Sequence, residues 1–140
     1  MAISDGGSLP GYEPYQANNG VGEAQNCLIF SWVHAGGAPG SSWMSLTWSS
    51  PKTVSWIAID THQSTLDSCG VLGRALGGAT VQYWDGAAWV AIGTVSGKTN
   101  DWSYVFPAPV TTTAIRLYGV YAIGGQNQNP IIYEWRVMGY

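Results

Sequence analysis

The carboxylates are the residues of this chain that most readily suggest catalysis. Beyond the first 26 residues there are five of them, Asp60, Asp67, Asp85, Asp101 and Glu134. A glycosidase needs two carboxyl groups about 5–10 Å apart across a cleft, whereas Asp85 and Asp101 are more typical of a turn and a loop cap. The sequence has no serine-hydrolase motif, no zinc-protease motif and no phosphate-binding loop. We therefore expect that the protein is not an enzyme.

Metal and redox ligands are equally sparse. His34 and His62 are isolated, with no second histidine at the spacing of a metal site, so exposed loop histidines are the simpler interpretation. Cys27 and Cys69 lack the CxxC spacing of a redox or zinc motif. They form either one disulfide or two buried thiols, and the sequence leaves both alternatives open.

Aromatic residues are the abundant group, since the 140 residues include 8 Trp and 8 Tyr. An aromatic ring can stack on the C–H face of a sugar, and a few polar side chains then fix the orientation of the ligand. The stretch ATVQYWDGAAWVAIG places Trp84 and Trp89 on either side of an Asp-Gly turn. This hairpin is either a ligand platform or the packed interior of a β-protein.

Charged residues make up only 9% of the chain, against roughly 25% in an average soluble domain. The surface must therefore be built from Ser, Thr, Asn, Gln, Gly and Tyr, which favours an extracellular or particle-bound setting. Five scattered basic residues form no patch that could neutralise a phosphate backbone, so we expect no nucleic-acid partner. No apolar run approaches the ~20 residues of a membrane span.

The first 26 residues are rich in Gly, Asn and Pro and predict an extended or irregular arm before a domain at 27–140. They contain neither the basic region nor the apolar region of a signal peptide. Either a leader is missing from the sequence, or the protein leaves its cell by another route, as a virion protein released by lysis does. An arm of this length reaches up to ~85 Å when fully extended, enough to attach to a neighbouring subunit.

The rest of the chain is a series of short apolar segments separated by turn signals such as SSP, Asp85-Gly86, PAP and GGQNQNP. No segment has a sustained helical period. The pattern predicts an all-β protein, a jelly-roll-type β-sandwich. The predicted strands are Trp43–Trp48, Val54–Asp60, Thr80–Trp84, Trp89–Val95, Trp102–Phe106, Ala114–Val120 and Ile131–Met138.

Alternation along these strands predicts which side chains face the core. Val81 and Tyr83 share one face of the hairpin, while Gln82 and Trp84 share the other. Each strand is thus expected to be half-buried. The same alternation separates Ile115 and Leu117 from Arg116, and Trp135 and Val137 from Glu134 and Arg136.

Four segments in series resemble the discoidin-type, galactose-binding-like β-sandwiches, which include the C-terminal domains of coagulation factors V and VIII and the family-32 carbohydrate-binding modules. VQYWDGAAWVAIGTV is similar to the SxDGxxW hairpin, and SSWMSLTWSSPKTVSWIAI to the strand pair WlxvdlgxpxtVxxv. FPAPVTTTAIRLYG resembles FxpvxaryvRL, and IIYEWRVMGY resembles the closing IxEixvyG strand. The resemblance covers roughly residues 28–140 and implies that Trp89 packs just after the turn.

The resemblance also implies a sugar site on loops at one end of the sandwich, where Arg74 could reach hydroxyls and Trp102 could supply a ring. The alternative is a solvated Arg74 and a packed Trp102. A structural calcium is implied too, with Glu134 matching the glutamate of the last strand, although NCLIF replaces the expected Asp-Gly. The candidate ligand-binding residues in or beside the loops are His34, His62, Arg74, Asn100, Trp102, Tyr104 and Tyr121.

Two functions follow from these observations. The first is a non-catalytic, lectin-like binding module that recognises a glycan or another surface ligand in recognition or adhesion. The second is a virion structural protein, a capsid decoration or a tail or fibre component, whose arm attaches to capsid or tail subunits. The expected location is extracellular or on a virion surface. Jelly-roll sandwiches serve both functions, so the fold alone does not choose between them.

Overall fold

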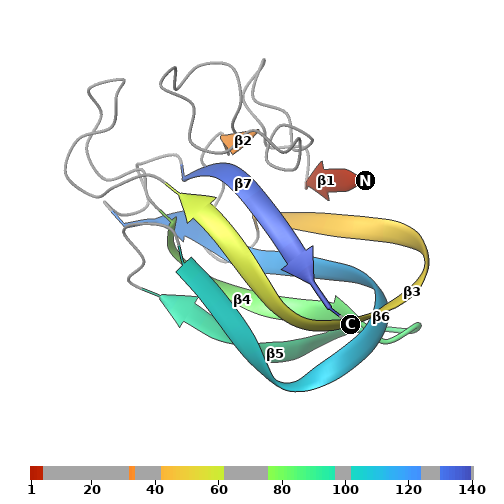
Figure 1. Ribbon diagram of the computed structural model, residues 1–140. Coiled ribbons are helices and arrows are strands. Elements are labelled where there is room, and N and C mark those ends of the chain that lie inside the picture. The colour runs from red at the N-terminus through yellow and green to blue at the C-terminus, as the bar shows by residue number, and fades with distance from the viewer. Residues whose placement is uncertain (5–31, 34–41, 62–75, 97–101, 124–129, 140) are drawn as a thin grey trace.

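The computed structural model describes residues 1–4, 32–33, 42–61, 76–96, 102–123 and 130–139, which form an antiparallel β-sandwich (Figure 1). These ranges contain no helix, and therefore none long and apolar enough to cross a membrane. The all-β prediction is confirmed. The strands are β1 (Ala2–Ser4), β2 (Trp32–Val33), β3 (Trp43–Thr61), β4 (Leu76–Trp84), β5 (Trp89–Ser96), β6 (Trp102–Ala122) and β7 (Ile131–Met138).

The two long strands, β3 and β6, bend and belong to both layers of the sandwich (Figure 1). The strand order is β2-β7-β3-β6-β4-β5, with β1 added to β3. The first half of β3 pairs with β1 on one side and with the second half of β6 on the other. That half of β6 pairs in turn with β4, and β4 pairs with β5. The second half of β3 pairs with the first half of β6 and with β7, which also pairs with β2. Each layer is therefore built around one half of the same strand pair.

The sequence-based prediction was wrong to break these strands at SSP and PAP. The chain continues as strand through both segments, and the β3–β6 register shifts there, between Thr47 and Lys52 and between Val54 and Trp56. Pro51 lies in the first unpaired stretch, and Pro107 and Pro109 lie in the second, opposite the Val54–Trp56 shift. Because proline has no N–H to donate, it suits a position where the ladder is interrupted. The prolines mark the bends at which each strand changes layer.

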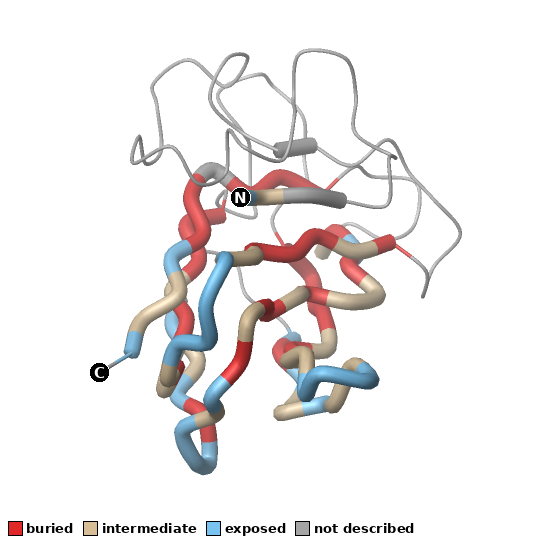
Figure 2. Tube along the Cα trace, turned by 90° about the vertical axis from the view of Figure 1, so that its right-hand side faces the viewer, coloured by how far each residue is buried: buried red, intermediate tan, exposed pale blue. Residues whose placement is uncertain are grey.

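The core lies between the layers and follows the predicted alternation. Val81, Ile115, Leu117 and Trp135 are all fully buried, at 0% exposure. Exposed residues gather at the bends and at the β4–β5 turn (Figure 2). Glu134 departs from the prediction, because it shares the outward face of β7 with exposed Arg136 and yet is buried.

The β4–β5 turn at Asp85-Gly86 has the predicted chemistry. Gly86 has a φ of 106°, a left-handed conformation that glycine adopts without a Cβ clash. The Asp85 carboxylate accepts hydrogen bonds from the Ala87 and Ala88 amides at 2.8 and 2.7 Å. The bonds from Ala88 and then Ala87 lower the pKa of Asp85.

The first residues of the chain belong to the sandwich. Ala2 pairs with Leu46, and the Met1 ammonium donates a 2.7 Å hydrogen bond to the Thr47 carbonyl. The beginning of the predicted arm is therefore an edge strand. The remainder of that arm lies in 5–31, outside the described residues, as do Cys27 and Cys69.

Candidate functional site

One end of the sandwich gathers the strand termini that lead into the long connecting segments (Figure 1). Because β3 and β6 bend back, both ends of each strand lie at this end. Thr61, the last residue of β3, joins the two layers here. Its hydroxyl donates to the Ile131 carbonyl at 2.8 Å and accepts from the Leu76 amide at 2.9 Å. We call this region the loop end.

Two of the ligand-binding residues predicted from the sequence, Trp102 and Tyr121, belong to strand ends in this region. Trp102 begins β6 at the loop end, paired with Ile59 of β3. Tyr121 lies near the end of β6 at the same end of the sandwich. Four further candidates, His34, His62, Arg74 and Asn100, lie outside the described residues, and their ligand-binding role stays a prediction.

Tyr121 presents an aromatic ring whose position is set by two glycines of β4. It pairs with Gly78 and is 43% exposed. A Cβ added at Gly78 would lie 2.5 Å from the Tyr121 hydroxyl, and one at Gly77 would lie 2.7 Å from Cε2 of the same ring. The ring therefore lies against glycine backbone, where any side chain would displace it. This arrangement leaves an oriented aromatic surface open to solvent.

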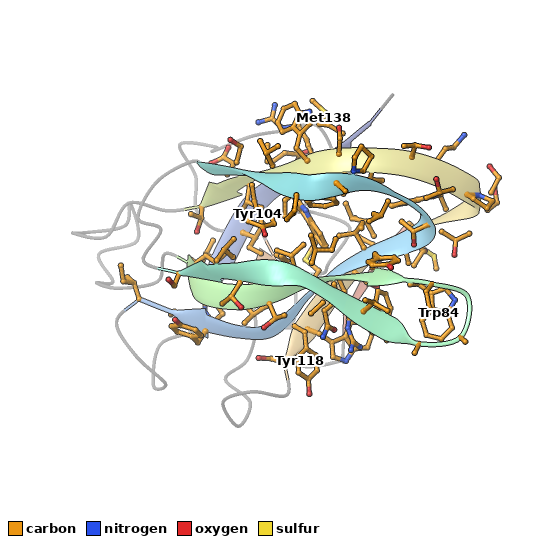
Figure 3. The ribbon with its side chains drawn as sticks, turned by 90° about the horizontal axis from the view of Figure 1, so that it is seen from below. Trp84, Tyr104, Tyr118 and Met138 are labelled. Atoms are coloured by element: carbon orange, nitrogen blue, oxygen red, sulfur yellow. The ribbon has the colours of Figure 1, made fainter. Side chains whose placement is uncertain are left out.

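Tyr104, in contrast, packs inside the sandwich (Figure 3). It points from β6 between the layers, with its ring centroid 5.9 Å from that of Phe106. Its hydroxyl lies against Gly93 of β5, where an added Cβ would be 2.8 Å from Tyr104 Cζ. The side chain is half-buried and packs against the core. It joins the layers and contributes no ring surface beside Tyr121.

Trp84 and Trp89 lie on the outer face of the β4–β5 hairpin. Their rings meet edge to face, with centroids 5.6 Å apart and an interplanar angle of 62°. Both are half-buried, and neither belongs to the core. Trp89 does pack, as the resemblance implied, but against Arg116 on the outer surface. The sequence-based search for a site did not include Arg116, because nothing local to either segment predicts that contact.

The carboxylates within the described ranges are Asp60, Asp85 and Glu134. Asp60 and Glu134 face each other in the β3–β7 register and are 6% and 5% exposed. Calcium takes six to eight oxygen ligands, and the described part of the chain holds no group of three or more His, Cys, Asp or Glu. These two carboxylates alone do not make a calcium site. The metal-binding role of Glu134 therefore stays a prediction from the resemblance.

A pocket of about 440 Å³ lies at the opposite end, beside the bend of β3. The indole of Trp48 forms part of its wall and donates a 2.8 Å hydrogen bond to the Thr112 carbonyl. None of the ligand-binding residues predicted from the sequence lines this pocket. The lining residues are Met1, Leu46, Thr47, Trp48, Lys52, Thr53, Val54, Val137 and Gly139.

Comparison with known proteins adds the class of fold. No protein-family model matches the chain, and no curated protein matches its sequence. The structure is similar to the family 32 module of C. perfringens NanJ in complex with galactose, with a TM-score of 0.74 and 15% identity over 98% of this chain and 91% of that one. It is also similar to chitosan-binding module 1 of a Paenibacillus sp. IK-5 chitosanase/glucanase, with a TM-score of 0.73 and 19% identity over 99% and 94%.

A third similar structure is the GH31 CBM32-2 module bound to GalNAc, with a TM-score of 0.76 and 11% identity over 100% of this chain and 97% of that one. The matches span nearly the whole length of these modules as well as of this chain. The protein therefore has the galactose-binding-like β-sandwich fold of family 32 carbohydrate-binding modules, as the sequence motifs predicted.

Proposed function

We propose that this protein is a non-catalytic carbohydrate-binding module whose ligand binds at the loop end. The observation that carries the proposal is the oriented, 43% exposed ring of Tyr121. A ring held against glycine backbone loses little freedom when a sugar stacks on it, because its position is already set by packing. Similar structures in complex with galactose and with GalNAc support the same ligand class.

The arrangement of the carboxylates supports binding without catalysis. Asp85 is engaged by two backbone amides of its own turn. Asp60 and Glu134 are neighbours on adjacent strands and are buried. None of the carboxylates within the described ranges therefore forms a pair across an open cleft, as glycoside hydrolysis requires.

The other ligand-binding residues predicted from the sequence would complete the proposed site. Trp102 begins β6 at the same end as Tyr121, and we expect it to supply a second ring. Arg74 is expected to donate hydrogen bonds to sugar hydroxyls, with Asn100, His34 and His62 beside it. We expect the module to act in an extracellular setting, where it adheres to glycans.

The proposal is tested by a glycan array followed by calorimetric titration of the best neutral glycan. Tyr121→Ala should weaken binding about tenfold, because it removes the stacking ring. Tyr121→Phe retains the ring and should bind within about threefold of the wild type. Val105→Ala changes an apolar side chain that is 71% exposed on β6, and it should leave affinity unchanged. Absence of binding to every glycan at millimolar concentration, or full affinity in Tyr121→Ala, would refute the proposal.

The alternative of a virion structural protein stays a prediction from the sequence. It relies on the segment up to residue 26 as an attachment arm. No observation on the described residues favours it, and the similar structures reported above are carbohydrate-binding modules. We therefore do not propose a second function.

A further inference from the structure

A second group of aromatic and polar side chains lies on the outer face of β4, β5 and β6, and we call it the Arg116 cluster. Its members are Gln82 and Trp84 of β4, Trp89 of β5, and Arg116 and Tyr118 of β6. Arg116 Cζ lies 4.3 Å from the centroid of the Trp89 ring and 4.7 Å from that of the Tyr118 ring. Both distances are within the ~6 Å at which a cation is attracted to an aromatic face. The guanidinium is thus held between two rings.

The strand register explains why these side chains meet. Gln82 of β4 is directly opposite Arg116 on one side and Ala91 of β5 on the other. Since alternate residues of a strand face the same way, Trp84 and Tyr118 lie on the same outer face. Figure 3 shows Tyr118 and Trp84 on the side of the molecule away from Met138, with Tyr104 between the layers. Arg116 extends across β4 to reach Trp89.

The hydrogen bonds of Arg116 leave part of its guanidinium available. Arg116 Nε donates a 2.6 Å hydrogen bond to Gln82 Oε1. Its two terminal nitrogens form no hydrogen bond and no ion pair with any other residue in the described ranges. Partial burial lowers the pKa of Arg116, yet an arginine remains charged at neutral pH. The terminal edge therefore carries four N–H donors with the orientation fixed by two rings and Gln82.

The Arg116 guanidinium is a local positive charge on a chain whose net charge is negative. With a net charge of −3, the protein as a whole repels anions. The other cationic side chains in the described ranges, Lys52 and Arg136, lie on other parts of the sandwich, at the bend of β3 and on β7, and the Met1 ammonium donates a hydrogen bond to the Thr47 carbonyl at the edge of β3. An anionic ligand would thus be selected by the local guanidinium rather than by the field of the whole molecule.

The boundary of the face limits where a ligand can lie. Ser45 of β3 is directly opposite Arg116 on the side away from β4, and it is only 1% exposed. Trp84, Trp89, Arg116 and Tyr118 are all half-buried and therefore partly open to solvent. Next to Arg116, the accessible part of the face is therefore over β6, β4 and β5, whereas half-buried Trp43 of β3 lies opposite Tyr118.

We infer that the Arg116 cluster is a second binding site, and that it binds a uronic acid residue of an acidic polysaccharide. The terminal N–H groups of Arg116 would donate two parallel hydrogen bonds to the carboxylate, the geometry in which arginine recognises planar anions. The sugar ring would stack on the open part of Tyr118, whose ring lies beside the guanidinium. A uronic acid carries its carboxylate directly on a ring carbon, so charge and stacking surface lie a few ångströms apart, as the guanidinium and the rings of the cluster do.

This inference does not depend on the proposed loop-end site, since the two sites use different residues. The test is calorimetric titration with tetragalacturonate and, as a matched neutral ligand, its methyl ester. The acid should bind at millimolar concentration or below, and the methyl ester at least tenfold more weakly. Arg116→Lys should lower affinity for the acid at least tenfold, because lysine retains the charge and loses the paired donors. Binding should also weaken in 0.5 M NaCl.

Two controls separate the outcomes. Arg136→Gln removes an exposed arginine of β7 and should leave affinity for the acid within twofold of the wild type. Tyr121→Ala should impair neutral glycan binding and leave tetragalacturonate binding intact. Thermal melting should show that Arg116→Lys remains folded. The inference is overturned if tetragalacturonate does not bind, if Arg116→Lys binds it as well as the wild type does, if Arg136→Gln weakens it equally, or if Tyr121→Ala abolishes it.

Discussion

The hydroxyl of Tyr104, on β6, occupies the space in which a side chain at residue 93 of β5 would begin. The two residues belong to opposite layers of the sandwich, and they are eleven positions apart in the sequence. Tyr104 thus spans the interior because position 93 is a glycine. Glycine is therefore required at position 93 because there is no space for a Cβ, and not because the backbone adopts a positive φ there.

Gly93→Ala should therefore lower the free energy of unfolding by about 1–3 kcal/mol, the usual cost of overpacking a closely filled interior. Urea denaturation at 25 °C measures the change. In a Tyr104→Phe background the hydroxyl is gone, so the same substitution should cost less, although Tyr104 Cζ would still be 2.8 Å from the new Cβ. Equal costs in both backgrounds would contradict this account.

Gly78→Ala should displace the ring of Tyr121, since the new Cβ would lie 2.5 Å from its hydroxyl and 2.7 Å from Cζ. On the proposed function, affinity for a neutral glycan should fall towards that of Tyr121→Ala. Calorimetric titration measures the loss. Gly78→Ala should cause no further loss of affinity in the Tyr121→Ala background, and an undiminished affinity of the single variant would count against the loop-end site.

Thr112→Val should destabilise the protein by about 1–3 kcal/mol, because it leaves buried backbone groups without a partner. Thr112 is 3% exposed, and its hydroxyl donates to the Trp84 carbonyl at 2.6 Å and accepts from the Ala114 amide at 3.1 Å. The adjacent Thr111 is the matched control. Its hydroxyl is exposed and shares a 3.2 Å hydrogen bond with Thr53, so Thr111→Val should change stability by about 0.5 kcal/mol or less. Urea denaturation compares the two variants: a shift of the midpoint with an unchanged m-value, the dependence of the free energy of unfolding on urea concentration, measures the change in stability.

Asp85 should make stability depend on pH in the acid range. Its folded pKa is below the ordinary value of 3.8, mainly because the Ala88 and Ala87 amides donate to the carboxylate. The ionised group therefore contributes stability above pH 3.8, and this contribution is lost as the pH falls through the folded pKa. Melting curves between pH 2 and pH 6 should show a wild-type advantage over Asp85→Asn at pH 6 that shrinks towards pH 2. A constant difference across this range would exclude the proposed linkage.

Local patterns in the sequence were sufficient for the faces of the strands. Val81 and Leu117 are buried as predicted, because side chains alternate across any strand whatever it pairs with. The Asp85-Gly86 turn was predictable for the same reason, since its hydrogen bonds and its positive φ involve only neighbouring residues.

Non-local arrangements were not predictable in this way. Pro51 and Pro107 are turn signals in isolation, and only the pairing of β3 with β6 makes them bends within continuous strands. The start of β4 was missed because Gly77 and Gly78 have low strand propensity, and Tyr121 of a distant strand covers them. Glu134 is on the outward face as alternation requires, but its burial next to Asp60 depends on tertiary context.

The sequence by itself determined the fold class, the Asp85-Gly86 turn and the face of each strand to which residues such as Val81 and Leu117 belong, because hydrophobic period and turn chemistry are local properties. Tertiary structure alone decided that Tyr104 packs inside while Tyr121 remains at the surface, since both are strand tyrosines and differ in what lies opposite them. It also decided that Arg116 meets Trp89 and Tyr118. That contact requires three strands to be in one register, and no segment of the chain contains the information for it alone.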